Sequence, residues 1–215
     1  MQKIGNGETA VEQRPTAAAV NRPLALLRPL LRLAHVEWEA IDNVPRIRLE
    51  KEPQGRLVIR PAVQDDLEVL WDFLAMAAYE SDAEAAKAVP SIAKYLVGWG
   101  RPGDFGFIAE QNGKIIGAAW ARRFSADELT SPYGDEETPK VSIGVNPNAR
   151  GQGIGETLMR ALIGEAARCG LGLCLSVRSE NPARRLYERL GFRDIPGSAA
   201  TNRAGGLSIG MALRR

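Results

Sequence analysis

The 215-residue sequence contains very few of the residues that usually bind metals or form disulfides. It has one histidine, His35, and two cysteines, Cys169 and Cys174. A disulfide framework needs more cysteines, and a zinc site needs several cysteines or histidines at short paired spacings. We interpret both cysteines as small apolar packing residues. The sequence therefore predicts neither a disulfide-stabilised fold nor a resident metal.

The chain also lacks a long apolar run and a strong excess of charge of one sign. No uninterrupted apolar segment is long enough to span a bilayer. The formal net charge is only +2, far below that of a protein that binds nucleic acid through its overall charge. The hydrophobic fraction of 45% and the charged fraction of 25% are typical of soluble globular proteins. We therefore expect a cytoplasmic protein that binds neither nucleic acid nor membranes.

The N-terminal quarter differs in composition from the rest. Residues 1–16 are polar, which favours disorder, whereas residues 17–40 are rich in Ala, Leu and Arg. A secretory signal needs an unbroken apolar core and a small-residue cleavage site, and neither is visible. A surface extension with a short amphipathic helix and an Arg-rich transit peptide both stay open, although early glutamates weigh against the second. We expect an extension over residues 1–55 and one domain over residues 56–215.

Hydrophobic periodicity predicts a mixed α/β domain. The clearest local signal is Asn112-Gly113, which separates two alternating apolar runs and predicts a tight hairpin. Asp65 and Asp66 precede a helical pattern, as an N-cap and a first-turn acid would. The expected elements are a strand, two helices, three strands, a helix, a strand, a helix and two strands: residues 57–61, 67–77, 91–99, 105–111, 114–124, from 141, from 153, 171–177, 182–190, 192–195 and 206–213.

A strand, a glycine-rich turn and a helix start follow one another after residue 141. Glycines let the backbone approach a phosphate, and amide N–H groups converge at the N-terminus of a helix. The helix dipole favours an anion there, and Arg150 adds a full positive charge. This order predicts a pyrophosphate site, although a turn that merely joins two elements stays an alternative.

Two other phosphate-binding motifs do not fit this turn. A P-loop needs a lysine directly after the glycines, and none follows here. A dinucleotide fingerprint needs an acidic residue at the end of the next strand, where the sequence has Arg178.

Two separate motifs resemble the GCN5-related N-acetyltransferase superfamily. Arg150, Gly153 and Gly155 meet its Arg/Gln-x-x-Gly-x-Gly/Ala signature. Residues 181–192 resemble its Asn-x-x-Ala-x-x-Leu-Tyr-x-x-x-Gly-Phe segment, with the difference that only Pro182 separates the asparagine from the alanine. The resemblance covers about residues 57 to 213. It implies an α/β (α+β) acyltransferase fold, with a mixed, mostly antiparallel sheet flanked by helices.

The resemblance also implies acetyl-CoA as co-substrate and direct transfer of its acetyl group to a primary amine in a ternary complex. Amides of the glycine turn, with Arg150, would hold the pyrophosphate. The strand before the turn would bind the pantetheine arm through its backbone, with the Val145 N–H directed at the thioester oxygen. The implied coenzyme-binding residues are Ile143, Val145, Arg150, Gly151, Gln152, Gly153, Ile154, Gly155 and Asn181.

The same resemblance places the general acid at Tyr187, which would protonate the departing thiolate. Tyr187 also falls at helical spacing with apolar neighbours, so a core role stays open. Relatives often carry a catalytic glutamate early on the strand before the glycine turn, where this chain has Lys140. Glu137 is the candidate base, with a solvated acidic loop as the alternative. Asn181 could steady the coenzyme arm, cap a helix, or do both.

The acceptor is predicted only as a small-molecule or peptide amine. Acidic residues between positions 127 and 137 favour a cationic amine. Candidate aromatic walls of the acceptor pocket are Trp71, Tyr79, Trp120 and Tyr133. A homodimer is expected from family habit. A non-catalytic acyl-CoA sensor stays an alternative because no obvious base is present, as does an accessory subunit that docks through residues 17–40.

Overall fold

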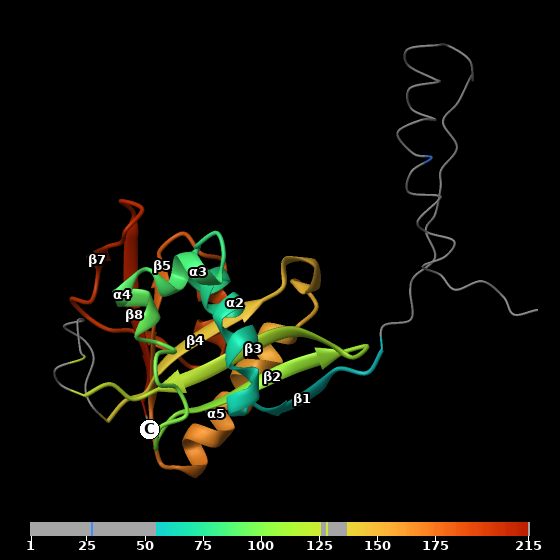
Figure 1. The fold of residues 1–215 in the computed structure, drawn as a ribbon. Coiled ribbons are helices and arrows are strands. Elements are labelled where there is room, and N and C mark those ends of the chain that lie inside the picture. Colours follow the sequence, from blue (N-terminus) through green and yellow to red (C-terminus); the bar gives the residue numbers. More distant parts are fainter. Residues whose placement is uncertain (1–26, 28–54, 126–127, 129–136, 215) are drawn as a thin grey trace, which may run out of the picture. The chain divides into compact units, whose positions relative to one another are not determined.

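The computed structural model describes residues 27, 55–125, 128 and 137–214. The chain divides into two compact units, Met1–Gly55 and Arg56–Arg215, and the second unit is described below (Figure 1). The expectations for the N-terminal extension, apart from Leu27, and for most of the acidic loop lie outside the described residues.

The second unit contains strands and helices in a mixed order. The elements are β1 (Val58–Pro61), η1 (Gln64–Asp66), α2 (Leu67–Ala78), α3 (Ala83–Lys87), α4 (Pro90–Ala93), β2 (Phe105–Gln111), β3 (Lys114–Arg122), β4 (Lys140–Val145), η2 (Pro147–Ala149), α5 (Ile154–Arg168), β5 (Leu173–Arg178), α6 (Arg184–Arg189), β6 (Arg193–Asp194), β7 (Ala200–Thr201) and β8 (Leu207–Leu213).

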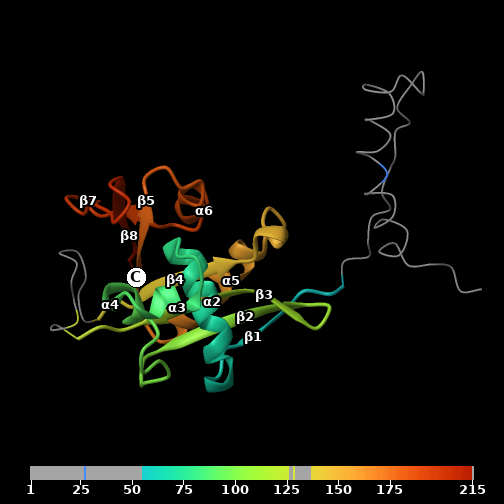
Figure 2. The ribbon, with the colours of Figure 1, turned by 45° about the horizontal axis from the view of Figure 1, so that its top comes forward.

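The strands form one sheet in the order β1-β2-β3-β4-β5-β8-β6, and β7 also pairs with β8. Every pairing is antiparallel except that of β4 with β5, which are parallel. This parallel pairing consists of one residue pair, Lys140 with Cys174, at the start of both strands. Beyond it, the half-sheet β1–β4 and the half-sheet containing β5 and β8 diverge (Figure 2). The expected mixed, mostly antiparallel sheet is therefore confirmed.

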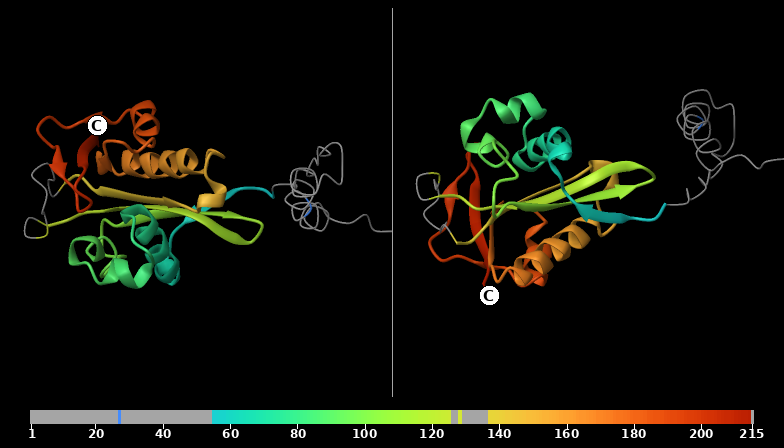
Figure 3. Two further views of the ribbon diagram at one scale, coloured as in Figure 1. Left: turned by 90° about the horizontal axis from the view of Figure 1, so that it is seen from above. Right: turned by 60° about the horizontal axis from the view of Figure 1, so that its bottom comes forward.

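Helices cover both faces of the sheet (Figure 3). Helices α2, α3 and α4 lie on one face, and α5 and α6 lie on the other. Each face has its own hydrophobic cluster, one built around Leu70, Phe73 and Trp120 and the other around Leu158 and Phe192. The splayed sheet therefore separates two independently packed layers.

Local sequence signals account for the regular parts of this architecture. Asn112 and Gly113 both have positive φ angles, 55° and 70°, as a tight hairpin turn between β2 and β3 requires. Helix α5 buries one face at helical spacing, through Ile154, Leu158, Met159, Leu162 and Ala166. The hairpin and the long helix are therefore confirmed.

Helix α2 packs directly on β4 at a glycine. A Cβ atom added to Gly144 would lie 2.6 Å from the Phe73 carbonyl oxygen and 3.0 Å from the Phe73 Cβ atom. Real Cβ atoms essentially never approach another atom closer than 3.0 Å, so only glycine fits here. This contact fixes the distance between α2 and the strand that borders the candidate site.

The prediction of one helix over residues 91–99 is wrong. The structure has α3 and the short α4 instead, followed by turns in which Gly98 and Gly100 have φ angles of 64° and 96°. These angles end any helix, because they belong to the left-handed region. Helix α3 was missed, although Asp82 caps it by accepting a 2.8 Å hydrogen bond from Ala85 N. Strand β7 was also missed, because two residues carry no periodic pattern.

Asp66 is an acid in the first turn of the 3₁₀ helix η1, as predicted, and it also makes a contact to β1. Its Oδ2 atom accepts a 2.8 Å hydrogen bond from Val63 N and lies 2.7 Å from Arg60 Nη1. The guanidinium group holds the pKa of the Asp66 carboxyl below its usual value. Asp66 therefore ties β1 to the start of α2.

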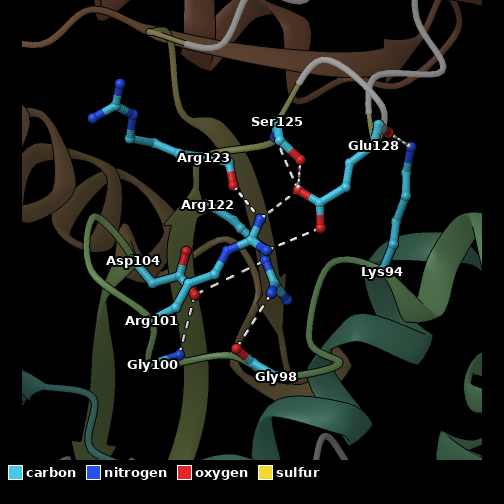
Figure 4. A network of polar contacts seen from close by, with 9 residues as sticks. All are labelled: Lys94, Gly98, Gly100, Arg101, Asp104, Arg122, Arg123, Ser125 and Glu128. Carbon is cyan, nitrogen blue, oxygen red and sulfur yellow. Dashed lines mark hydrogen bonds and ion pairs between the residues drawn. The ribbon is translucent and has the colours of Figure 1, made fainter.

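A buried ion pair lies at the end of β3 (Figure 4). The Arg122 Nε and Asp104 Oδ2 atoms are 3.9 Å apart, and both side chains are almost fully buried. Arg122 Nη2 donates to Gly98 O at 3.3 Å, and Gly100 N donates to Asp104 Oδ2 at 3.1 Å. Burial raises the pKa of the Asp104 carboxyl and lowers that of the Arg122 guanidinium. The pair orders the loop between α4 and β2 at the cost of desolvating two charges.

Candidate active site

A cavity of about 1360 Å³ lies where β4 and β5 diverge. Its walls come from the ends of α2 and β5, from β4, from the start of α5, from α6 and from the segment between β7 and β8. Pockets for a single drug-sized ligand are typically about 300–1000 Å³. The cavity is therefore large enough for a long coenzyme arm and a second substrate together.

The edge of β4 that faces the cavity presents backbone groups. Asn146 N donates to Ile116 O at 2.9 Å, toward β3. Backbone groups of successive residues in a strand point to opposite edges, so those of Val145 and Ile143 point away from β3. A 3.1 Å hydrogen bond from Arg150 Nε to Val145 O agrees with this direction. Because β5 pairs with β4 only at Lys140, this edge is left for a ligand.

The glycine turn leads from β4 into α5. Gly151 and Gly153 have φ angles of 75° and 80°, and a Cβ atom on either would meet nothing within 4 Å. Glycine is favoured at both positions by backbone conformation and not by lack of space. The turn brings the first amides of the 15-residue α5, which have no acceptor within the helix, to the cavity. Arg150 lines the cavity beside them and is exposed.

The structure brings most of the predicted coenzyme-binding residues together around the cavity. The lining includes Ile143, Val145, Arg150, Gly151, Gly153, Ile154, Gly155 and Asn181. Gln152 is not among the lining residues, and its Nε2 atom donates to Asn148 O at 3.4 Å. The prediction that Gln152 helps to bind the coenzyme stays a prediction.

Asn181 makes two contacts in the predicted position. Its Oδ1 atom accepts a 2.9 Å hydrogen bond from Ala183 N, so it begins the turn that precedes α6. The helix itself starts later than predicted, at Arg184. Asn181 Nδ2 donates to Tyr79 Oη at 2.9 Å. The Asn181 side chain therefore has a capping role and also links the segment before α6 to Tyr79 at the end of α2.

Tyr187 belongs to the hydrophobic core and also lines the cavity. It is 7% exposed and packs against Phe192, with a ring-centroid distance of 6.1 Å. Burial, with a smaller contribution from the nearby Tyr79, raises the pKa of the Tyr187 hydroxyl to about 12. The phenol therefore holds its proton at neutral pH, as a proton donor to a thiolate must.

The structure does not place the candidate base, Glu137, at the cavity. Glu137 precedes β4, is exposed and is not a lining residue. Lys140, which stands where relatives often have a glutamate, is buried, and burial lowers the pKa of its ammonium group. Glu128, another described residue of the acidic loop, pairs with Arg101 at 2.7 Å and is likewise not a lining residue.

Of the candidate aromatic walls, Tyr79 lines the cavity. Trp71 and Trp120 were wrongly assigned, because both are buried in the cluster under α2. Tyr133 lies outside the described residues.

Several charged residues that line the cavity were not predicted from the sequence. Among the described residues, the carboxylates that line the cavity are Glu80 and Glu156. Glu80 follows α2 and forms a 2.5 Å ion pair with Arg203, from the segment between β7 and β8. Arg178 ends β5 and was noted only as a mismatch to the dinucleotide motif. No periodic pattern or motif marks such isolated side chains, which come together only in the fold.

Two further findings concern the described part of the chain. It contains no helix long and apolar enough to cross a membrane. It also contains no group of three or more His, Cys, Asp or Glu side chains that could hold a metal ion.

The sequence is similar to those of known proteins. Residues 67–192 match the model of the Acetyltransferase (GNAT) family. The chain is 32% identical over 198 residues to a mycothiol acetyltransferase from Mycobacteroides abscessus, which covers 88% of this chain and 62% of that protein. It is also 36% identical over 87 residues to an L-methionine sulfoximine/L-methionine sulfone acetyltransferase from Salmonella typhimurium, covering 40% and 48% of the two chains. The chain thus spans about three fifths of the mycothiol acetyltransferase that it matches.

The fold is similar to solved structures. A Salmonella typhimurium protein described as a putative acetyltransferase, with its cofactor acetyl-CoA, superposes with a TM-score of 0.57 at 22% identity. The match covers 74% of this chain and 94% of that one. The ribosomal-protein-S18-alanine N-acetyltransferase from Escherichia coli gives a TM-score of 0.53 at 25% identity, covering 74% and 93%.

Proposed function

The chain belongs to the GNAT acetyltransferase family, and on that premise we propose that it transfers an acetyl group from acetyl-CoA to a primary amine. The observation that carries this proposal is the meeting of three features in one cavity: the β4 edge, the glycine turn and the start of α5. Together they offer backbone donors along a groove that ends in an anion site. The activity is proposed for the domain of residues 56–215, with residues 1–55 as an extension, in a cytoplasmic protein.

The coenzyme would bind mainly through the backbone. Amides at the start of α5, with the Arg150 guanidinium, are positioned to hold the pyrophosphate. The outward-facing backbone groups of Ile143 and Val145 are positioned to hydrogen-bond the amides of the pantetheine arm. The Val145 N–H would then stabilise the negative charge that develops on the thioester oxygen.

The transfer itself needs few side chains. The neutral amine attacks the thioester carbon, the carbon–sulfur bond breaks, and the departing thiolate takes a proton from the Tyr187 hydroxyl. Burial keeps that hydroxyl protonated at neutral pH, since it raises the pKa of Tyr187 to about 12. The proton lost by the amine then has to pass to a base or to water.

Glu80 is the better-placed candidate for that base. Glu156, the other carboxylate of the lining, lies in the first turn of α5 and pairs with Arg160 at 2.7 Å, beside the proposed phosphate site. Glu80 is also paired, with Arg203, but it lies away from the proposed phosphate site, next to Tyr79. Glu137 stays a prediction from the sequence.

Calorimetric titration with acetyl-CoA tests the proposal. Arg150→Glu should weaken binding by about tenfold or more, because it replaces a charge-assisted hydrogen-bond donor with a like charge. Arg56→Glu is the matched control, since Arg56 is exposed near the edge strand β1 and makes the same change in net charge. Acetylated product from a panel of amines would then be measured by mass.

Three outcomes separate the alternatives. Binding that is lost in Arg150→Glu and kept in Arg56→Glu, with product formation, would establish the transferase. A folded wild-type chain that does not bind acetyl-CoA would refute it. Binding without turnover on any amine would favour the non-catalytic acyl-CoA sensor.

A further inference from the structure

Four arginines line the cavity, and two of them are already paired with acids. Arg189 lies 3.6 Å from Glu156, and Arg203 lies 2.5 Å from Glu80. Neither Arg150 nor Arg178 forms an ion pair with an acidic residue in the described part of the chain. Arg150 stands at the proposed pyrophosphate site, which leaves the positive charge of Arg178 to be explained.

Arg178 lies over an aromatic ring. Its guanidinium carbon lies 3.7 Å from the centroid of the Tyr79 ring. Stacking of this kind occupies the face of the guanidinium group and leaves its N–H edges available for in-plane hydrogen bonds. A planar carboxylate matches those edges with two parallel hydrogen bonds.

The ring under Arg178 is itself fixed. Tyr79 ends α2 in a left-handed conformation with a φ angle of 62°, which is uncommon for a residue other than glycine. Its hydroxyl accepts the 2.9 Å hydrogen bond from Asn181 Nδ2. Arg178 is fixed from the other side by β5, where it pairs with Ser208 of β8. The position of Arg178 is therefore set by three contacts: the Tyr79 ring, the Asn181 side chain that holds this ring, and the pairing of β5 with β8.

Arg178 belongs to a different wall of the cavity from the glycine turn. Its neighbours there are the end of α2, with Tyr79 and Glu80, and the segment that carries Arg203. Glu80 and Arg203 pair with each other, so Arg178 is the lining residue of this wall that adds a positive charge without an ion-pair partner. Arg178 also interacts electrostatically with Glu180, which is not a lining residue. A positive charge here differs from the acidic rim that the sequence predicted. Two members of that rim are described: Glu128, which pairs with Arg101, and the exposed Glu137.

We propose that Arg178, stacked on Tyr79, binds a carboxylate group of the acceptor. The preferred acceptors are then amines that also carry a carboxylate, such as α-amino acids and acidic peptides. The inference rests on the proposed acetyl transfer and adds the substrate class. It assigns Arg178 to substrate selection and gives it no part in the bond-forming step.

Paired acceptors provide the test. Each amine that carries a carboxylate is compared with its amide, for example a free amino acid with the corresponding amino-acid amide. The variants are Arg178→Gln, which removes the charge, and Arg178→Lys, which keeps the charge without the planar fork. Acetyl-CoA affinity and the melting temperature are measured for each variant, because Arg178 also packs against Tyr79.

We expect the wild type to have a higher kcat/KM for the carboxylate member of a pair than for the amide. Arg178→Gln should raise the KM for the carboxylate member by about 10- to 100-fold, with kcat and the amide reaction little changed. Arg178→Lys should recover part of this loss. Acetyl-CoA affinity should stay within about twofold of the wild-type value.

Four results would overturn the assignment. Equal loss for both members of a pair would indicate a structural role, and loss of acetyl-CoA affinity would assign Arg178 to a coenzyme phosphate. A wild type that acetylates both members equally would refute the assignment while leaving the transferase intact. A wild type that binds acetyl-CoA and acetylates no member of any pair would refute both proposals.

Discussion

The contact between α2 and β4 leads to a sharp prediction for Gly144→Ala. The new Cβ atom would lie 2.6 Å from the Phe73 carbonyl oxygen, which is backbone and cannot rotate away. To restore ordinary contact, the helix and the strand must separate by roughly 0.8 Å. Overpacking of this kind typically costs about 1–3 kcal/mol. In a domain of this size, the melting temperature should fall by roughly 3–10 °C.

A second alanine substitution provides the control with the opposite sign. Gly164 lies on the exposed side of α5, and a Cβ atom there would meet nothing within 4 Å. Gly164→Ala should stabilise the domain by about 0.5–1 kcal/mol, because alanine restricts the unfolded chain and favours the helix. Urea unfolding followed by circular dichroism gives both free energies.

The comparison also tests how α2 and β4 position the site. Tyr79 follows α2, and β4 carries Val145. A shift of α2 relative to β4 in Gly144→Ala should therefore weaken both coenzyme binding and the reaction with the acceptor. Gly164→Ala should change neither. If Gly144→Ala is as stable as the wild type, α2 does not pack directly on β4 at Gly144, and this contact does not position the site.

Three further predictions follow from groups described above. Tyr187→Phe should lower kcat by about 100-fold with little change in acetyl-CoA affinity, and unchanged turnover would limit Tyr187 to the core. Because burial raises the pKa of Tyr187 to about 12, wild-type kcat should show no loss from phenol ionisation near pH 10; a fall there that Tyr187→Phe lacks would contradict this. Arg122→Met should destabilise the domain by on the order of 3 kcal/mol, because it leaves the Asp104 carboxylate buried without its cation. Burial raises the pKa of Asp104 above its unfolded value, so the folded protein holds this proton more tightly. The loss of stability in Arg122→Met should therefore shrink as pH falls. A loss that is independent of pH in urea unfolding would refute this account.

The coenzyme side of the site could be predicted because its signals are local in sequence. A strand, a glycine turn and a helix start are contiguous, and each follows from short-range rules. The orientation of Val145 could not be predicted in the same way. It depends on which neighbour pairs with Asn146, and on β5 leaving β4 after one residue pair.

The wall that we propose for the acceptor could not be predicted, because it is assembled from distant segments. Tyr79, Arg178 and Arg203 come from three elements, and none belongs to a periodic pattern that marks its direction. Aromatic residues were a poor guide for a physical reason. Trp120 is fully buried, and its Nε1 atom donates to Tyr95 O at 3.1 Å. The polar group of the indole is therefore hydrogen-bonded inside the core.

The divergence of β4 from β5 also has an evolutionary consequence. The wall that would receive the coenzyme offers peptide groups, which every residue type except proline supplies. The opposite wall offers individual side chains on the end of α2, on β5 and between β7 and β8. With the proposed roles, substitutions there other than at Tyr79, which Asn181 contacts, would change the choice of amine more than the binding of the donor. An ancestral protein of this shape could acquire new acceptors through a few surface changes while its reaction stayed the same.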